Sequence, residues 1–111
     1  MSYQSANKQR KHLELPFNFY PEYQSWKSMR ARCYNPNATG YNRYGGKGVS
    51  IWWIWRNDFE AFYMYMGSRP SHEHSIDRYP DKDGNYVPGN VRWATSREQA
   101  NNRRPRQCHN L

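Results

Sequence analysis

Side chains able to bind phosphate lie in two groups, one in each half of the chain. Each is a cation or an amide, the types that contact nucleic-acid backbones. Taken singly, such residues are more often solvated than bound, but together they are typical of a phosphate track. The predicted DNA contacts are Lys27, Arg30, Arg43, Lys47, Arg92, Arg97, Asn101, Arg104 and Arg106.

The charge of the chain is unevenly placed along its 111 residues. Residues 1–47 carry a net charge of +6, residues 48–91 a net charge of −2, and residues 92–111 a net charge of +4. Two basic flanks around an acidic middle favour a polyanion bound at both ends, with a cation such as a metal ion held between them. A solubilising surface without a partner is the alternative.

Cysteine and histidine patterns do not indicate a zinc site or a disulfide framework. Cys33 and Cys108 stand 75 positions apart with no C-x-x-C pair, so we expect reduced thiols in a cytoplasmic protein. His72 and His74 form an H-x-H pair that would face one side of a strand. The longest apolar run, residues 51–55, is too short to span a bilayer, and the N-terminus lacks the apolar stretch of a signal peptide.

Aromatic residues are expected to build the core. Leu, Ile, Val and Phe total only 13 residues, a composition typical of disorder, but the chain also has 5 Trp and 10 Tyr. Large rings bury roughly 150–250 Å² each, so a small core can form from them. We therefore interpret Trp52, Trp53, Trp55 and Trp93 as core residues rather than base-stacking ones.

The front half of the chain predicts two helices around a glycine-rich turn. A helix beginning at Pro21 would carry the stripe Tyr23, Trp26, Met29 and Cys33 and end at residues 35–36. The glycines in residues 45–48 suit a tight turn or a close approach to a ligand. Residues 49–53 read as a strand, and residues 57–66 as a helix capped by Asn57 with Glu60.

The last third of the chain predicts a strand, a loop, a strand and a helix. Residues 75–79 and 91–94 are the strands, Asp83-Gly84 is a turn, and Thr95 with Glu98 forms a capping box for a helix that Pro105 ends. The fold class is therefore α+β in a single domain. We place a flexible basic arm at residues 1–19, the domain at residues 20–106 and a tail at residues 107–111.

This last segment resembles a known family. Residues 75–104, SIDRYPDKDGNYVPGNVRWATSREQANNRR, are similar to the ββα-metal core of HNH endonucleases. They resemble in particular the phage-type group with the pattern D-R, then G-x-Y-x-P-x-N-x-R-W-A-T-x-x-E-Q. The front half of that group is also similar to the upstream segments Ser25-Trp26 through Met29, Arg32-Cys33, Asn35-Pro36, Tyr44-Gly45-Gly46-Lys47-Gly48, Met66-Gly67 and Arg69-Pro70. The resemblance therefore covers roughly residues 20–104, with the core at about residues 72–104.

The resemblance implies a metal site and a role for each matching residue. Asp77 and Gln99 would hold the ion, for which oxygen ligands favour Mg²⁺ or Mn²⁺. Arg78 takes the place of the family's water-activating histidine, and Asn90, twelve positions later, takes that of the asparagine that orients it. The ion would act as a Lewis acid on a scissile phosphate.

Arg78 cannot itself be a general base, because its guanidinium stays protonated. It can stabilise phosphate charge through a bidentate contact. Restriction enzymes of the superfamily with Asp-Arg at this place are thought to use a tyrosine, which makes Tyr44, beside the glycine turn, the first candidate. Metal-bound water and a histidine remain alternatives.

The function expected from these observations is metal-dependent endonuclease cleavage of double-stranded DNA, by a protein that is monomeric or homodimeric. A DNA-binding module with a decayed nuclease core is the main alternative, for which Arg78 and Gln99 argue. A basic RNA-binding domain is a third possibility, based on charge and aromatic residues alone.

Overall fold

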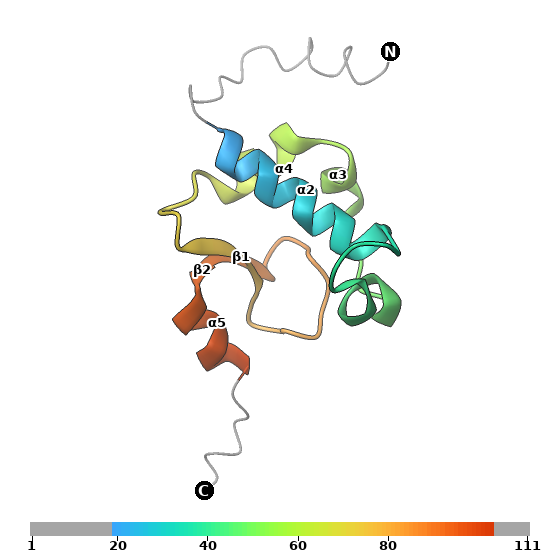
Figure 1. Ribbon diagram of the computed structural model, residues 1–111. Coiled ribbons are helices and arrows are strands. Elements are labelled where there is room, and N and C mark those ends of the chain that lie inside the picture. Colours follow the sequence, from blue (N-terminus) through green and yellow to red (C-terminus); the bar gives the residue numbers. More distant parts are fainter. Residues whose placement is uncertain (1–18, 104–111) are drawn as a thin grey trace, which may run out of the picture.

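The computed structural model describes residues 19–103 (Figure 1). Most of the predicted arm, the tail, Pro105 and the predicted DNA contacts Arg104 and Arg106 lie outside the described residues. The elements in chain order are α2 (Tyr20–Tyr34), the short 3₁₀ turns η1 (Tyr41–Arg43) and η2 (Gly45–Lys47), α3 (Trp53–Arg56), α4 (Phe59–Met66), β1 (His74–Arg78), β2 (Val91–Thr95) and α5 (Ser96–Arg103).

Helix α2 forms where the sequence predicts it. Pro21 occupies its first turn, where a missing N–H leaves no bond unmade. Trp26, Met29 and Cys33 are buried along one face. The helix ends as Asn35 becomes extended before Pro36, with its N–H still bonded to the Ala31 carbonyl oxygen at 2.9 Å. The predicted apolar stripe and its end are confirmed.

The core is aromatic, as the composition predicts. Trp55, Phe62 and Tyr86 are almost fully buried, and the Trp55 and Phe62 rings meet edge to face with centroids 5.5 Å apart. The Trp26 indole N–H donates to the Trp55 carbonyl oxygen at 2.8 Å, which joins α2 to α3. The expectation was wrong for Trp53, whose side chain is 70% exposed.

Two local predictions in the front half were also wrong. Residues 49–53 make a single isolated bridge, Ile51 to Tyr86, and α3 already begins at Trp53. The cap of α4 is Asp58, whose carboxylate accepts from the Ala61 N–H at 3.1 Å. Asn57 instead accepts from the Arg30 side chain at 3.3 Å. The carboxylate of Asp58, one position after Asn57, thus accepts the hydrogen bond from the first turn of α4.

The last third forms the predicted strand, loop, strand and helix. β1 and β2 are antiparallel, with Asp77 paired directly opposite Arg92. The capping box that opens α5 is present: the Thr95 N–H donates to Glu98 Oε1 at 2.8 Å and the Glu98 N–H donates to Thr95 Oγ1 at 3.2 Å. The backbone bond from Thr95 lowers the pKa of the Glu98 carboxyl.

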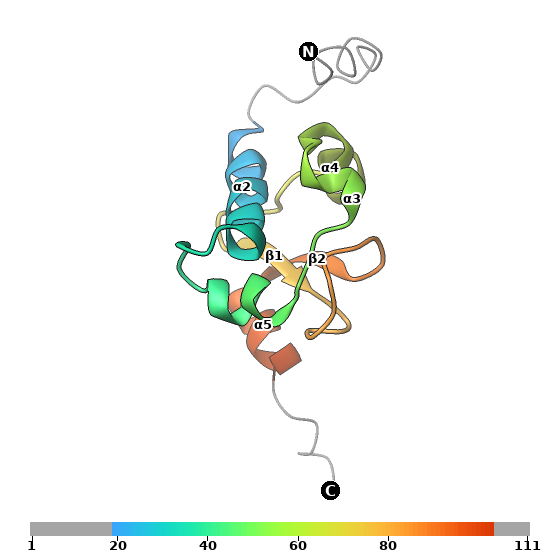
Figure 2. The same ribbon diagram turned by 90° about the vertical axis from the view of Figure 1, so that its right-hand side faces the viewer.

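The two-stranded sheet lies between α5 and the other helices (Figures 1 and 2). α2, α3 and α4 pack together at one end of the molecule, and α5 packs on β2 and β1 at the other. The described residues therefore form a small α+β domain. None of its helices has both the length and the apolar character that a membrane crossing requires.

Candidate functional site

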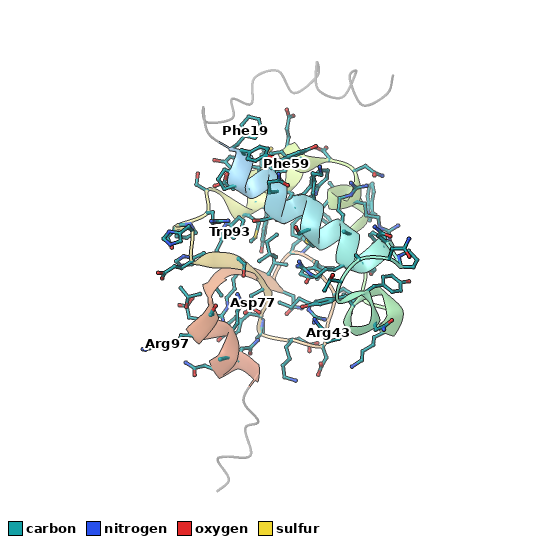
Figure 3. The ribbon with its side chains drawn as sticks, viewed as in Figure 1. Phe19, Arg43, Phe59, Asp77, Trp93 and Arg97 are labelled. Carbon is teal, nitrogen blue, oxygen red and sulfur yellow. The ribbon has the colours of Figure 1, made fainter. Side chains whose placement is uncertain are left out.

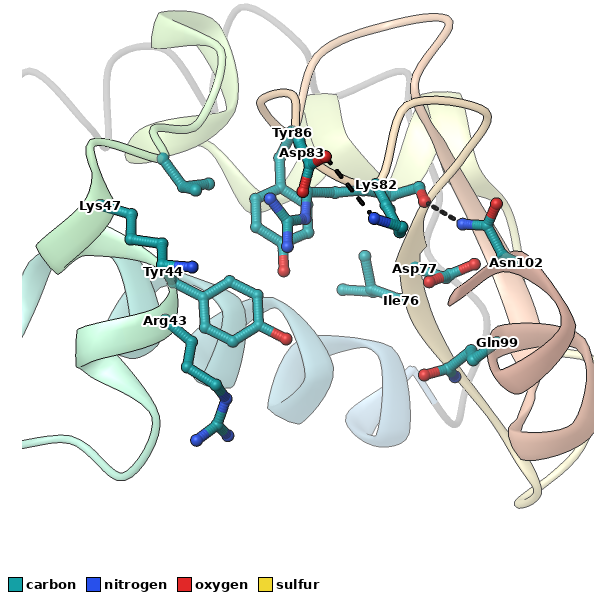
Figure 4. A pocket seen from close by; sticks show the side chains of 12 residues that line it. Arg43, Tyr44, Lys47, Ile76, Asp77, Lys82, Asp83, Tyr86, Gln99 and Asn102 are labelled. Atoms are coloured by element: carbon teal, nitrogen blue, oxygen red, sulfur yellow. Dashed lines mark hydrogen bonds and ion pairs between the residues drawn. The ribbon is translucent and has the colours of Figure 1, made fainter. Parts of the chain in front are cut away.

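A pocket of about 460 Å³ opens between the glycine-rich turns, β1, the loop that follows it, and α5. Figure 4 shows it with Tyr44 on one wall and Asp77 and Gln99 on the other. Four residues singled out from the sequence for catalysis or metal binding share this pocket. The polar residues that line it are Arg43, Tyr44, Lys47, Asp77, Arg78, Lys82, Asp83, Tyr86, Gln99 and Asn102.

The wall that carries Tyr44 depends on Gly45. A Cβ built at Gly45 would lie 2.1 Å from the carbonyl oxygen of Cys33, so only glycine lets this turn pack against the end of α2. Gly48 closes the turn with φ of +89°. The sequence suggested either a tight turn or a close approach to a ligand; these glycines form a tight turn, and at Gly45 the close approach is to the protein's own helix.

Asp77 forms the opposite wall together with an ion pair behind it. Its side chain is 14% exposed, and its Oδ2 accepts from Arg92 Nε at 3.0 Å. Arg92 was predicted to contact DNA. The structure instead engages its guanidinium with Asp77, with the Glu98 carbonyl oxygen at 3.2 Å and with the Tyr79 ring.

Two amide side chains of α5 make their hydrogen bonds within the protein through the amide nitrogen. Gln99 Nε2 donates to Ser75 Oγ at 2.7 Å and to the Ala94 carbonyl oxygen at 3.0 Å. Asn102 Nδ2 donates to the Arg78 carbonyl oxygen at 3.0 Å. Because a backbone carbonyl only accepts, each of these bonds identifies the amide nitrogen and leaves the amide oxygen for another partner.

The donor set fits a hard divalent cation. Asp77, Gln99 and Asn102 all line one pocket, and carboxylate and amide oxygens, supplemented by water and phosphate, are the ligands that Mg²⁺ and Mn²⁺ prefer. Within residues 19–103, no group of three or more His, Cys, Asp or Glu side chains that could hold a metal ion is found.

Arg78 is held by the loop and by two aromatic rings. Its Nη1 donates to the Gly84 carbonyl oxygen at 2.9 Å. Its Cζ lies 4.9 Å from the centroid of the Tyr44 ring and 5.6 Å from that of Tyr86. These contacts leave other N–H groups of the fork for an anion in the pocket.

Asn90 holds the loop rather than touching Arg78 directly. Its Oδ1 accepts from the Asp81 N–H at 2.8 Å, and its Nδ2 donates to the carbonyl oxygens of Asp81 at 3.0 Å and Asn85 at 2.9 Å. The loop so fixed presents the Gly84 carbonyl to Arg78. Asn90 can therefore influence the position of Arg78 only through this loop.

Two tyrosines lie at this pocket, and they differ in environment. Tyr86 is buried, which raises the pKa of its hydroxyl, while Arg32, bonded to that hydroxyl at 3.2 Å, acts in the opposite direction. Tyr44 is half-buried, and its hydroxyl makes no hydrogen bond to any residue in the range 19–103. In Figure 4 this hydroxyl points toward the Asp77 side of the pocket. Of the two, Tyr44 is thus the tyrosine whose oxygen is placed to contact a ligand in the pocket.

The predicted DNA contacts that the structure describes lie in three places: at the rim of the pocket, on or beside α5, and on α2. Arg43 and Lys47 are exposed at the rim of the pocket, and Arg97 is exposed on α5 (Figure 3). Asn101 lines a neighbouring hollow of about 360 Å³ with Arg92. Lys27 and Arg30 instead lie over the rings of Tyr23 and Trp26, at 5.6 and 4.9 Å.

The histidine alternative for the base gains no support. His74 Nδ1 lies 2.8 Å from Ser71 Oγ, and its strand partner is Thr95 at the far end of β1 from Arg78. His72 is exposed. Neither histidine is among the residues that line the pocket.

Sequence reasoning gave no site role to six residues that line the pocket: Val49, Ile76, Lys82, Asp83, Tyr86 and Asn102. The signal for Asn102 was available, because it follows Gln99 by three positions and so lies on the same helix face. Tyr86 is held at the pocket by its backbone bridge to Ile51, a contact between segments distant in sequence. No local pattern indicates that bridge.

Comparison with known proteins gives no match: no family model, no curated protein and no solved structure corresponds to this chain. The likeness to HNH endonucleases therefore rests on the residues quoted above.

Proposed function

We propose that this protein is a metal-dependent DNA endonuclease of the HNH type that hydrolyses phosphodiester bonds. The observation that carries the proposal is the shared pocket. Asp77, Arg78, Gln99 and Tyr44 come from a strand, a helix and a distant turn, yet all four line it. A chance surface would not be expected to gather the four positions that the resemblance implies.

The residues proposed to bind the metal lie on the opposite side of this pocket from two of the cations proposed to bind phosphate (Figure 4). Asp77, Gln99 and Asn102 would hold Mg²⁺ or Mn²⁺, which supplies Lewis acidity toward a scissile phosphate when bound. Arg43 and Lys47 lie at the opposite rim, where they would bind phosphates of the DNA backbone. This division supports a duplex lying across the pocket.

Arg78 and Tyr44 take complementary roles in the proposed reaction. The Arg78 fork stabilises the negative charge that grows on the phosphate oxygens, a role in which it remains protonated. Tyr44 would act as a tyrosinate: once its hydroxyl proton has gone to solvent, its oxygen orients the attacking water and accepts a proton from it. The 4.9 Å contact between the Arg78 Cζ and the Tyr44 ring keeps the two groups together.

A DNA-binding module with a decayed nuclease core is the second candidate. One observation favours it: at the place of the family's base stands Arg78, which is tied to the Gly84 carbonyl oxygen and cannot accept a proton. On this view the pocket still binds a phosphate, but no water is activated.

A plasmid-nicking assay with Mg²⁺, Mn²⁺ or EDTA separates the two. We expect cleavage with either metal and none with EDTA, and Asp77→Ala should abolish cleavage while DNA affinity stays close to that of the parent. The matched control is Asp83→Ala, which removes an 85%-exposed carboxylate from the same pocket and should cleave normally. Metal-dependent binding without cleavage by the parent would favour the decayed module.

A further inference from the structure

Arg92 makes three contacts within the protein through its guanidinium group. Its Nε donates to Asp77 Oδ2 at 3.0 Å, its Nη2 donates to the Glu98 carbonyl oxygen at 3.2 Å, and its Cζ lies 3.9 Å from the centroid of the Tyr79 ring. Strand pairing sets Asp77 directly opposite Arg92. The guanidinium is therefore fixed by contacts from β1, from the residue that follows it and from α5.

The Arg92–Asp77 pair differs from an ordinary surface ion pair. Its side chains are 27% and 14% exposed, whereas those of the Lys82–Asp83 pair are 42% and 85% exposed. Exposed pairs contribute little and change partners readily. A half-buried pair whose arginine also has a ring and a carbonyl as partners keeps one geometry.

The pair divides the two oxygens of Asp77 between two environments. Oδ2 accepts from Arg92. Asp77 lines the large pocket, while Arg92 lines the neighbouring hollow with Tyr79 and Asn101. Arg92 thus holds the carboxylate from outside the pocket and leaves Oδ1 for a ligand within it.

We propose that Arg92 is a positioning residue for the metal ligand Asp77. It fixes which carboxylate oxygen faces the ion. Its positive charge also partly neutralises the carboxylate, which weakens the attraction between Asp77 and the ion. This inference rests on the proposed function, because it requires a divalent cation at Asp77.

The two effects of Arg92 oppose each other, which makes the role testable. Removing a positive charge that shares a carboxylate with a divalent cation should tighten metal binding by on the order of tenfold. Releasing the carboxylate from its fixed orientation should slow cleavage at saturating metal by roughly 10–100-fold, the usual consequence of losing a group that orients a ligand. Affinity and rate therefore move in opposite directions.

Three variants separate this role from the alternatives. Arg92→Gln removes charge and fork, and Arg92→Lys keeps the charge but not the two-point contact with Asp77 and Glu98. Arg97→Gln removes the same charge from an exposed position on α5. For each we would measure Mn²⁺ binding to the protein alone by calorimetry, DNA affinity in EDTA, and the nicking rate at saturating Mn²⁺.

We expect Arg92→Gln to bind Mn²⁺ more tightly, to nick more slowly, and to keep its DNA affinity within about twofold. Arg92→Lys should return Mn²⁺ affinity to that of the parent without full recovery of the rate. Arg97→Gln should leave Mn²⁺ affinity unchanged and weaken DNA binding, lowering the salt slope by about one. Circular dichroism melting in EDTA checks that each variant is folded, and a misfolded protein would not gain Mn²⁺ affinity.

Two results would overturn the inference while leaving the proposed function standing. One is parental Mn²⁺ affinity in Arg92→Gln; the other is a loss of DNA affinity in Arg92→Gln that matches Arg97→Gln, which would make Arg92 a phosphate contact. If the parent itself binds no Mn²⁺, or if Asp77→Ala binds it equally well, the proposed metal site fails and the inference fails with it.

Discussion

Replacing Asn90 by alanine should destabilise the domain by about 3 kcal/mol. The side chain is 9% exposed and makes three hydrogen bonds of 2.8 to 3.0 Å to the backbone of Asp81 and Asn85. A typical bond of this kind contributes about 1 kcal/mol net, and a buried partner left without one adds to the loss. Water can reach part of the opened loop, since Asp81 and Asn85 are exposed, so we expect the sum of the three bonds and no more.

Urea denaturation followed by tryptophan fluorescence measures this loss, because the core contains Trp26 and Trp55. The matched control is Asn85→Ala, which removes one bond, from the Ser50 N–H to Asn85 Oδ1 at 2.9 Å, at an exposed position. We expect about 1 kcal/mol or less for the control. A change below about 1 kcal/mol for Asn90→Ala, or equal changes for the two variants, would refute the view that Asn90 holds the loop.

The same variant tests how Asn90 serves the site. Its loop presents the Gly84 carbonyl oxygen to Arg78, so a loosened loop should release the guanidinium. At a temperature where Asn90→Ala is still folded, we expect cleavage to fall by roughly 10-fold or more, with DNA affinity retained. Normal cleavage by the folded variant would show that the loop does not position Arg78.

Four further predictions address the pocket and its surroundings. Tyr44→Phe should slow cleavage by roughly 10²–10⁴-fold with folding and DNA binding preserved, and full activity would leave metal-bound water as the base. Arg78→Lys should cleave slowly and Arg78→Ala more slowly still, while any activity in Arg78→His would mean that an imidazole can work at this place. DNA affinity should fall on the order of 10²-fold or more between 50 and 200 mM salt, so a flat salt profile would contradict phosphate binding. Burial raises the pKa of the Cys33 thiol to about 11, so in a Cys108→Ser background a disulfide reagent at pH 8 should label it only after denaturant is added.

Local patterns predicted most of the elements because their causes are local. The stripe through Trp26, Met29 and Cys33 defines α2 by helical spacing. Thr95 and Glu98 open α5 through bonds only three residues apart. The sequence offers two adjacent side chains that can cap α4, Asn57 and Asp58. The prediction of Asn57 was wrong, because the cap is Asp58.

Predictions that depend on partners far along the chain succeeded less often. Residues 49–53 have the composition of a strand, but a strand needs a neighbour along its length, and here Tyr86 supplies only one bridge. Trp53 reads as core by residue type, yet the orientation of α3 leaves it exposed. Both outcomes follow from packing, which composition does not specify.

The sequence by itself determined the spacing of the candidate site residues, since Asp77, Arg78, Asn90 and Gln99 all lie in one hairpin and the helix after it. Only the tertiary structure decided what each can touch. Packing of Gly45 against Cys33 brings Tyr44 to the pocket, and strand register sets Arg92 against Asp77. The physical reason is that these contacts join segments whose approach depends on the whole core, so no local pattern encodes them.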